Sequence, residues 1–311
     1  MLSFELSDGV WPTMVTPFTE SGEVDYEAVD PLVDWYLAAG VDGLFAVCQS
    51  SEMFFLALDE RVALTERIVK RVDGRCGVIT SGHTAEELSE QAEEIDAMAE
   101  TGAQAVVLVT NRLNSRNEGD QSWIRNAEKL LAKIDAAVPL GLYECPFPYK
   151  RLLSRELLGW VTQTDRFFFL KDTSCDRSIV AERANCCTGE SLKLYNANSS
   201  TLLYSLGLGY SGYSGVMANF HPELYVRLCR NWQQQPREAE RLLSLLSIAA
   251  GIEGHGYPKN AKRYLRALGV PITDYCRSRS EPLLDYWELE LQHLDELTQC
   301  ASEQFSLEAP R

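Results

Sequence analysis

Short apolar runs recur along the first two-thirds of the chain, and each is followed by a longer segment that mixes polar and apolar residues. The runs are rich in β-branched and aromatic residues. Such runs are typical of strands buried on both faces of a parallel sheet. The expected strands are residues 10–16, 43–48, 76–80, 104–110, 139–144, 167–171, 192–196 and 212–217.

The segments between these runs have apolar residues at helical spacing. The clearest are residues 24–40, 58–72 and 84–102. Asp59 is the expected N-cap of the second segment. Thr84 and Glu87 form a capping-box pattern at the start of the third, which predicts that this helix begins at Thr84.

Strand–helix alternation through eight units predicts an α/β fold, a (β/α)8 TIM barrel. The alternative is a doubly wound open sheet, which usually opens with a glycine-rich first turn that binds a nucleotide. Here the first expected strand runs into TPFTESGEVD, residues 16–25, which lacks that fingerprint. The closed barrel is therefore the favoured architecture.

The pattern changes after residue 221, where helical segments follow one another without intervening strands. They are residues 221–235, 236–251, 257–269 and 281–299. We expect the first to be the last helix of the barrel. This divides the chain into a catalytic barrel domain, 1–235, and a helical C-terminal extension, 236–311.

The chain is acidic, with 29 Lys and Arg against 45 Asp and Glu in 311 residues and a formal charge of −16. The acidic residues are spread along expected helix faces and form no tail, which indicates a solvated surface. Because no cluster of basic residues is present, we expect neither a nucleic acid nor an anionic membrane as a partner.

The nine cysteines are scattered, their number is odd, and no C-x-x-C pair occurs. Free thiols in a reducing cytoplasm explain this pattern better than disulfides or a zinc site. The start of the sequence shows no secretory signal, and no apolar run approaches the ~18 residues of a membrane span. We therefore expect a cytoplasmic protein.

Candidate chemistry lies at the strand ends, because barrel enzymes place their catalytic groups there. Lys171 follows four apolar residues in FFFLK. Apolar surroundings disfavour the ammonium form, and a neutral amine can attack a carbonyl to form an imine. A strand-capping lysine, or one paired with Asp172, is the structural alternative.

Two neighbouring strand ends offer supporting groups. Tyr143, in LYECP, could move protons near an imine, or could serve only in packing. Ser50 and Ser51, in CQSSE, offer hydroxyls and successive backbone N–H groups suited to a carboxylate, or to a local turn.

Glu52, Glu144 and Asp172 are carboxylates at strand ends, and they leave open a magnesium-assisted enolate lyase on the same barrel. We expect no metal otherwise. The four histidines are not spaced as ligand pairs, and a structural or solvent-facing role is expected for each: His83, His221, His255 and His293.

Taken together, the segments resemble the dihydrodipicolinate synthase / N-acetylneuraminate lyase family of class I aldolases. The resemblance runs from Val10 to Arg277, through GVWPTMVTPFTESGEVD, GVDGLFAVCQSSE, LDER, GAQAVVLVT, LYECP, FFFLKDTS and GYSGVMANFHPELY. The order and spacing of these segments are more specific than any one motif.

The resemblance implies roles for individual residues. Lys171 matches the Schiff-base lysine, and Tyr143 matches the tyrosine that relays protons. Ser50 matches the second hydroxyl of the loop that holds the carboxylate of the 2-oxo acid. Ala197 falls near a backbone position that contacts pyruvate, and Ser214 falls where a branched apolar residue often packs on the imine.

Several positions depart from the family pattern. Gln49 stands at the first hydroxyl position, Ser51 replaces a glycine, and Arg112 and Leu113 replace tyrosines of the loop after strand four. Pro148 stands where the synthase carries an arginine for its second substrate. The pyruvate half of the site is thus kept and the acceptor half is rebuilt.

We therefore expect a Schiff-base lyase that acts on pyruvate or a related 2-oxo acid without a cofactor, by aldol chemistry or by dehydration of a 2-oxo-3-deoxy sugar acid. It is not expected to be the lysine-biosynthesis enzyme itself. Arg112 is the candidate contact for a distal anionic group. The resemblance also implies a homo-oligomer, a tetramer or a dimer. A catalytically silent, metabolite-binding homologue is the alternative that the substitutions at Gln49 and Leu113 suggest.

Overall fold

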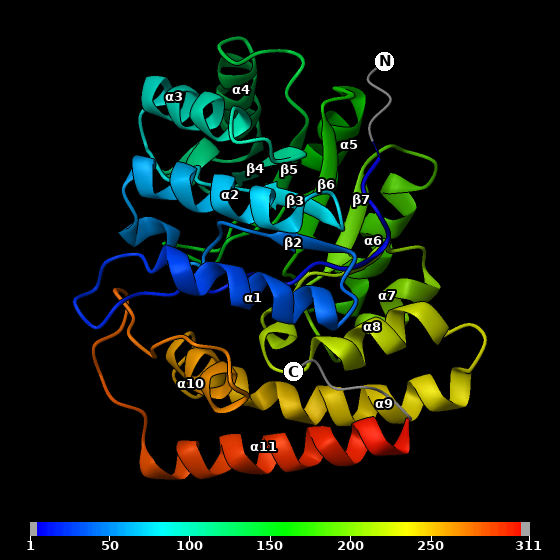
Figure 1. Ribbon diagram of the computed structural model, residues 1–311. Coiled ribbons are helices and arrows are strands. Elements are labelled where there is room, and N and C mark those ends of the chain that lie inside the picture. Colours follow the sequence, from blue (N-terminus) through cyan, green and yellow to red (C-terminus); the bar gives the residue numbers. More distant parts are fainter. Residues whose placement is uncertain (1–4, 306–311) are drawn as a thin grey trace.

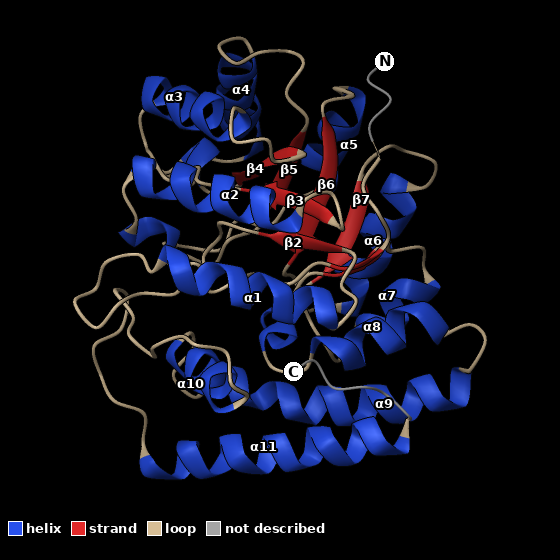
Figure 2. Ribbon diagram, in the orientation of Figure 1, coloured by secondary structure: helices blue, strands red, loops and turns tan. Residues whose placement is uncertain are grey.

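The computed structural model describes residues 5–305. Eight parallel strands form a barrel, and helices surround it (Figures 1 and 2). The strands are β1 (Gly9–Val10), β2 (Gly43–Phe45), β3 (Gly77–Thr80), β4 (Ala105–Val109), β5 (Leu140–Tyr143), β6 (Phe167–Asp172), β7 (Lys193–Asn196) and β8 (Gly212–Tyr213). They follow the order β1-β8-β7-β6-β5-β4-β3-β2, and a parallel bridge between Thr13 and Phe45 joins the first two strands. This closure confirms the expected TIM barrel.

One helix follows each strand. These helices are α1 (Tyr26–Ala38), α2 (Leu58–Val72), α3 (Leu88–Ala99), α4 (Asp120–Leu131), α5 (Arg155–Gln163), α6 (Arg177–Cys187), α7 (Leu202–Gly207) and α8 (Pro222–Asn231). Three more follow the barrel: α9 (Pro236–Ala249), α10 (Lys259–Ala267) and α11 (Asp285–Gln304). α9 packs on α7 and α8, and α10 packs on α11. None of the helices described could span a membrane.

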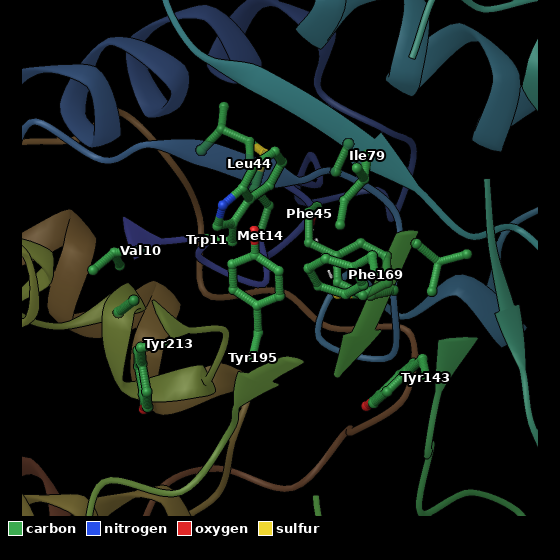
Figure 3. Close-up of a cluster of buried hydrophobic side chains, with 14 of the residues drawn as sticks. Val10, Trp11, Met14, Leu44, Phe45, Ile79, Tyr143, Phe169, Tyr195 and Tyr213 are labelled. Atoms are coloured by element: carbon green, nitrogen blue, oxygen red, sulfur yellow. Dashed lines mark hydrogen bonds between the residues drawn. The ribbon is translucent and has the colours of Figure 1, made fainter. Parts of the chain in front are cut away.

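The barrel interior is filled by aromatic side chains (Figure 3). Phe169 stacks on Tyr195 with ring centroids 4.6 Å apart, and Trp11 packs edge-on against Tyr195. Gly43 and Gly77 leave the space that the Trp11 indole occupies, because a Cβ at either position would lie within 2.4 Å of that ring. A barrel filled in this way is a packed core, so ligands can bind only at its ends.

Two helix starts differ from expectation. α2 has Ala57 as its N-cap, and the Glu60 carboxylate accepts the Ala57 N–H at 2.9 Å, so Asp59 lies inside the first turn. α3 begins at Leu88, because the Thr84 N–H is held at 2.7 Å by Glu94 from within α3. That contact keeps residues 84–87 outside the helix. The first and last expected strands are also shorter than predicted, because only Gly9–Val10 and Gly212–Tyr213 pair as strands.

Candidate active site

Lys171 lies near the carboxyl end of β6 with its side chain inside the barrel, and it is 3% exposed. Its Nζ lies 4.9 Å from the centroid of the Tyr143 ring. Throughout residues 5–305, no group forms a hydrogen bond or ion pair with this nitrogen. Burial lowers the pKa of Lys171 to about 8, although Cys48 and Glu253 oppose the shift. The structure thus contains an amine that loses its proton far more readily than a surface lysine.

Adjacent strands place Tyr143 beside the lysine, because Tyr143 on β5 pairs in register with Lys171 on β6. The phenol donates to Gln49 Oε1 at 3.4 Å. Burial raises the pKa of Tyr143 well above 10, so the group stays a phenol at neutral pH. A buried phenol beside an amine can donate a proton to, and recover it from, an oxygen bound to the same carbon.

The residues that follow Tyr143 and Lys171 point to the other face of the sheet, as alternation along a strand requires. The Glu144 and Asp172 carboxylates both contact Arg183 on α6, with Arg183 Nη1 at 2.9 Å from Glu144 and 2.6 Å from Asp172. Tyr210 donates to Asp172 at 2.6 Å. This buried cluster ties β5 to β6 outside the barrel and leaves Lys171 without a carboxylate partner.

The same contacts remove the oxygen ligands on which a magnesium site depended. Glu144 and Asp172 are held by Arg183, and Glu52 is held by Lys262 Nζ at 2.6 Å and by the Ser278 N–H at 2.7 Å. Since all three carboxylates are paired with cations, the geometry does not favour an enolate lyase that uses them to bind a metal.

The loop after β2 forms the wall beside the lysine. Ser50 lines the cavity, and its Oγ donates to Thr13 Oγ1 at 3.1 Å. The amides of Ser51 and Glu52 are used inside the turn, bonded to Cys48 O and Gln49 O. Among the described residues, the amides of Gln49 and Ser50 have no acceptor, so these two amides, and not the later ones, are the available donors.

Other predicted site residues are divided between the cavity and its surroundings. Ala197 lines the cavity. Ser51 is fully buried with its Oγ 2.6 Å from Met14 O, so it supports the loop and does not face a ligand. Ser214 is buried behind the cavity wall, and its hydroxyl has no partner in the described part of the chain.

Arg112 does not reach the cavity. Its guanidinium pairs with Glu86 at 3.1 Å and lies 5.0 Å from the ring centroid of Phe54, which does line the cavity. The structure therefore places Arg112 behind the wall, which does not support a direct contact with a distal anionic group. Leu113 is buried beside it.

The cavity at this end of the barrel has a volume of about 430 Å³, and part of its wall comes from beyond the barrel. Glu253, Tyr257 and Arg279 belong to the C-terminal extension, and Lys150 belongs to the loop after β5. Tyr257 accepts a hydrogen bond from Asn219 Nδ2 at 3.1 Å, and its hydroxyl faces Ser50, which opposes the rise of its pKa. Sequence reasoning missed Glu253, Tyr257 and Arg279 because no local pattern shows where the distant helices return to the barrel.

The comparisons with known proteins agree with this geometry. The family model described as "Dihydrodipicolinate synthetase family" matches residues 6–302. The chain belongs to the dihydrodipicolinate synthetase family. Members of this family are lyases, and the chain is a lyase of that family.

Individual relatives are distant. A 4-hydroxy-tetrahydrodipicolinate synthase of Shewanella pealeana is 28% identical over 216 residues, which are 70% of this chain and 71% of the relative. A dihydrodipicolinate synthase from Bacillus anthracis has a TM-score of 0.85 at 19% identity and covers 94% of this chain and 99% of its own. A prophage protein of the family from Escherichia coli K12, solved in complex with pyruvate, has a TM-score of 0.84 at 21% identity, with 94% and 98% covered. At these identities the structural likeness establishes only the fold. The substrate has to be inferred from the residues of the site.

Proposed function

We propose that the chain is a class I lyase that forms a Schiff base between Lys171 and pyruvate or a related 2-oxo acid. The observation that carries the proposal is the buried Lys171 amine, which has no partner among the described residues and faces a cavity beside Tyr143. The pyruvate bound to the Escherichia coli family member supports the same substrate class.

The reaction would begin with attack of the neutral amine on the ketone. With a pKa of about 8, roughly a tenth of Lys171 is neutral at pH 7, against less than about a thousandth for an ordinary lysine. Tyr143 would donate the proton with which the carbinolamine loses water, and the resulting iminium would accept the electrons of the carbon–carbon bond.

The 2-oxo acid carboxylate would bind at the β2 loop. The amides of Gln49 and Ser50 are the free donors at that wall, and the Ser50 hydroxyl would join them by turning its proton from Thr13 Oγ1 to the carboxylate. Ala197 would contact the substrate from the end of β7. This arrangement points the methyl group of pyruvate away from the β2 loop, toward the mouth where an acceptor would enter.

The acceptor half supports an aldol or dehydration reaction other than that of the synthase. Where the family arginine is expected stands Pro148, and the cations near the mouth are Lys150 and Arg279. Neither cation forms an ion pair with a carboxylate in the described chain. We propose a hydroxylated aldehyde as the acceptor of pyruvate, or a 2-oxo-3-deoxy sugar acid as the single substrate in cleavage or dehydration.

Reductive trapping tests the proposal. Borohydride added with pyruvate should reduce the imine and block trypsin at Lys171, which yields the peptide 167–177 with one pyruvate-derived adduct. Lys150→Ala should keep this adduct and Lys171→Ala should lose it. Absence of an adduct in the wild-type chain, across several 2-oxo acids, would reject the proposal. Thermal stabilisation by a 2-oxo acid without trapping would favour the silent homologue instead.

Location and assembly complete the proposal. All nine cysteines are free thiols, which supports a reducing compartment such as the cytoplasm. We propose a homo-oligomer, a tetramer or dimer, on the family resemblance, and sedimentation analysis of the purified chain would test it.

A further inference from the structure

Gln49 ends the proton path from Tyr143. The phenol donates to Gln49 Oε1 at 3.4 Å, and Cys145 Sγ donates to the same oxygen at 3.2 Å. A carboxamide neither gains nor loses a proton near neutral pH. Tyr143 can therefore serve the oxygen atom at the Lys171 carbon, but these contacts give it no connected group that could serve a second oxygen atom of the substrate.

An aldol reaction needs such a second proton transfer. When the carbon–carbon bond breaks, the hydroxyl on the acceptor carbon must lose its proton to become a carbonyl. When the bond forms, the carbonyl oxygen must gain a proton. A positioned acid–base group usually performs this step.

Most ionisable groups that line the cavity cannot take that proton. Tyr257 has a pKa raised well above 10 by burial. Glu52 is bound to Lys262 and to the Ser278 amide. Arg279 has a guanidinium group, which only donates hydrogen bonds and offers no acceptor for a proton.

Two further ionisable groups of the cavity wall, Lys150 and Cys175, both contact the backbone oxygen of Thr173. Lys150 Nζ donates to Thr173 O at 2.9 Å, and Cys175 Sγ lies 3.5 Å from it. Burial raises the pKa of the Cys175 thiol, which disfavours the thiolate. Neither group offers a free base to the cavity.

Glu253 remains. It lies in the 3-10 turn Ala250–Gly254 after α9, and it lines the cavity together with Lys171. Its carboxylate forms no hydrogen bond or ion pair with any of residues 5–305. The residue is solvent-accessible at the mouth, which is the side from which an acceptor must come.

We propose that Glu253 is the catalytic acid–base group at the acceptor carbon, and this inference rests on the Schiff-base function proposed above. In cleavage, the Glu253 carboxylate takes the proton of the acceptor hydroxyl. The O–H electrons form the aldehyde carbonyl, and the electrons of the broken carbon–carbon bond move into the iminium to give the enamine. In condensation, the enamine attacks the aldehyde, and the protonated Glu253 gives its proton to the new alkoxide.

The electrostatic setting suits both directions. Desolvation in the cavity raises the pKa of Glu253 above its usual value, and the nearby Lys171 and Lys150 oppose the shift. A carboxyl group with a raised pKa exchanges protons at neutral pH more readily than an ordinary glutamate.

Partial reactions separate this role from that of Lys171. Deuterium exchange of the pyruvate methyl group needs the imine, the enamine and a base for the methyl proton, and that base is the Tyr143 phenolate left when the carbinolamine loses water. Pyruvate consumption with an aldehyde also needs the acceptor-side proton. We expect Glu253→Gln to keep reductive trapping and methyl exchange within about twofold and to lower kcat with hydroxylated aldehydes by about 100-fold or more. Glu240→Gln, an exposed glutamate on α9, is the matched control and should keep wild-type rates in every assay.

Each other result overturns the inference. An unchanged kcat, or a higher KM for the aldehyde at unchanged kcat, would make Glu253 a binding residue at most. Loss of trapping in a Glu253→Gln protein with wild-type thermal stability would show that it acts on Lys171. If the wild-type chain shows trapping and methyl exchange but consumes no aldehyde, there is no acceptor-side proton transfer for Glu253 to catalyse. Failure of trapping in the wild-type chain would reject the Schiff-base function first, and this inference with it.

Discussion

Replacing Arg183 by methionine tests whether the buried ion cluster holds the two catalytic strands together. Arg183 is 1% exposed and contacts both Glu144 and Asp172, which are themselves no more than 1% exposed. The cluster carries one positive and two negative charges, so the variant leaves two carboxylates buried with no cation. Removing one partner of a buried ion pair costs about 3–5 kcal/mol, and we expect the free energy of unfolding to fall by this amount.

The loss should depend on pH. Burial already raises the pKa of Glu144 above its usual value, and Arg183 opposes that rise. In Arg183→Met this opposition is lost, so the folded-state pKa of Glu144 rises further above its unfolded value. The unfolded state then releases more protons as pH rises, so the deficit grows between pH 5.5 and pH 8. Lowering the pH protonates Glu144 and relieves part of the cost.

Urea unfolding at the two pH values measures this difference. Arg67→Met is the control, because its 2.7 Å pair with Asp30 is partly exposed and should contribute about 0–1 kcal/mol. A loss below about 1 kcal/mol in Arg183→Met, or an equal loss at both pH values, would refute the reasoning.

Three further predictions concern the cavity. The initial rate of imine formation should rise about fivefold from pH 7 to pH 8 and only about twofold more by pH 9, since the neutral fraction of Lys171 grows from roughly 10% at pH 7 to roughly 90% at pH 9. A flat trapping rate would contradict the lowered pKa. Tyr143→Phe should slow trapping and turnover by about 10²–10⁴ at unchanged thermal stability, and wild-type rates would remove it from the mechanism. Tyr257→Phe removes the hydroxyl that interacts with Ser50 and should raise the KM for pyruvate about fivefold, the equivalent of about 1 kcal/mol, while kcat stays nearly constant. A change in kcat alone would show a different role.

The barrel and its central pair could be predicted because their signals are local. Short β-branched runs at regular intervals indicate parallel strands, and a lysine after four apolar residues stands out at a strand end. Adjacent strand ends in a barrel must meet, so the sequence alone predicts that Tyr143 and Lys171 lie together. The structure confirms this neighbourhood through the β5–β6 register.

The outer parts of the site could not be predicted because their signals are distant in sequence. Glu253 and Arg279 reach the mouth only through the packing of α9 to α11, and no spacing in the sequence reports that packing. Helix starts were misplaced for a related reason: the Glu94 carboxylate, ten residues beyond Thr84, holds the backbone that a capping box would have used. Arg112 has a partner in Glu86 that a strand-end argument does not consider.

The division of the cavity wall between barrel and extension has an evolutionary consequence. The proposed electron-accepting step depends on β5 and β6, whereas part of the entrance is formed by residues 250–279, about eighty positions or more further along the chain. Under the proposed function, mutations in that later stretch would alter which aldehydes are admitted while the lysine and its phenol stay untouched. A library confined to residues 250–279, with Glu253 kept, is therefore a direct route to new acceptors for the same nucleophile.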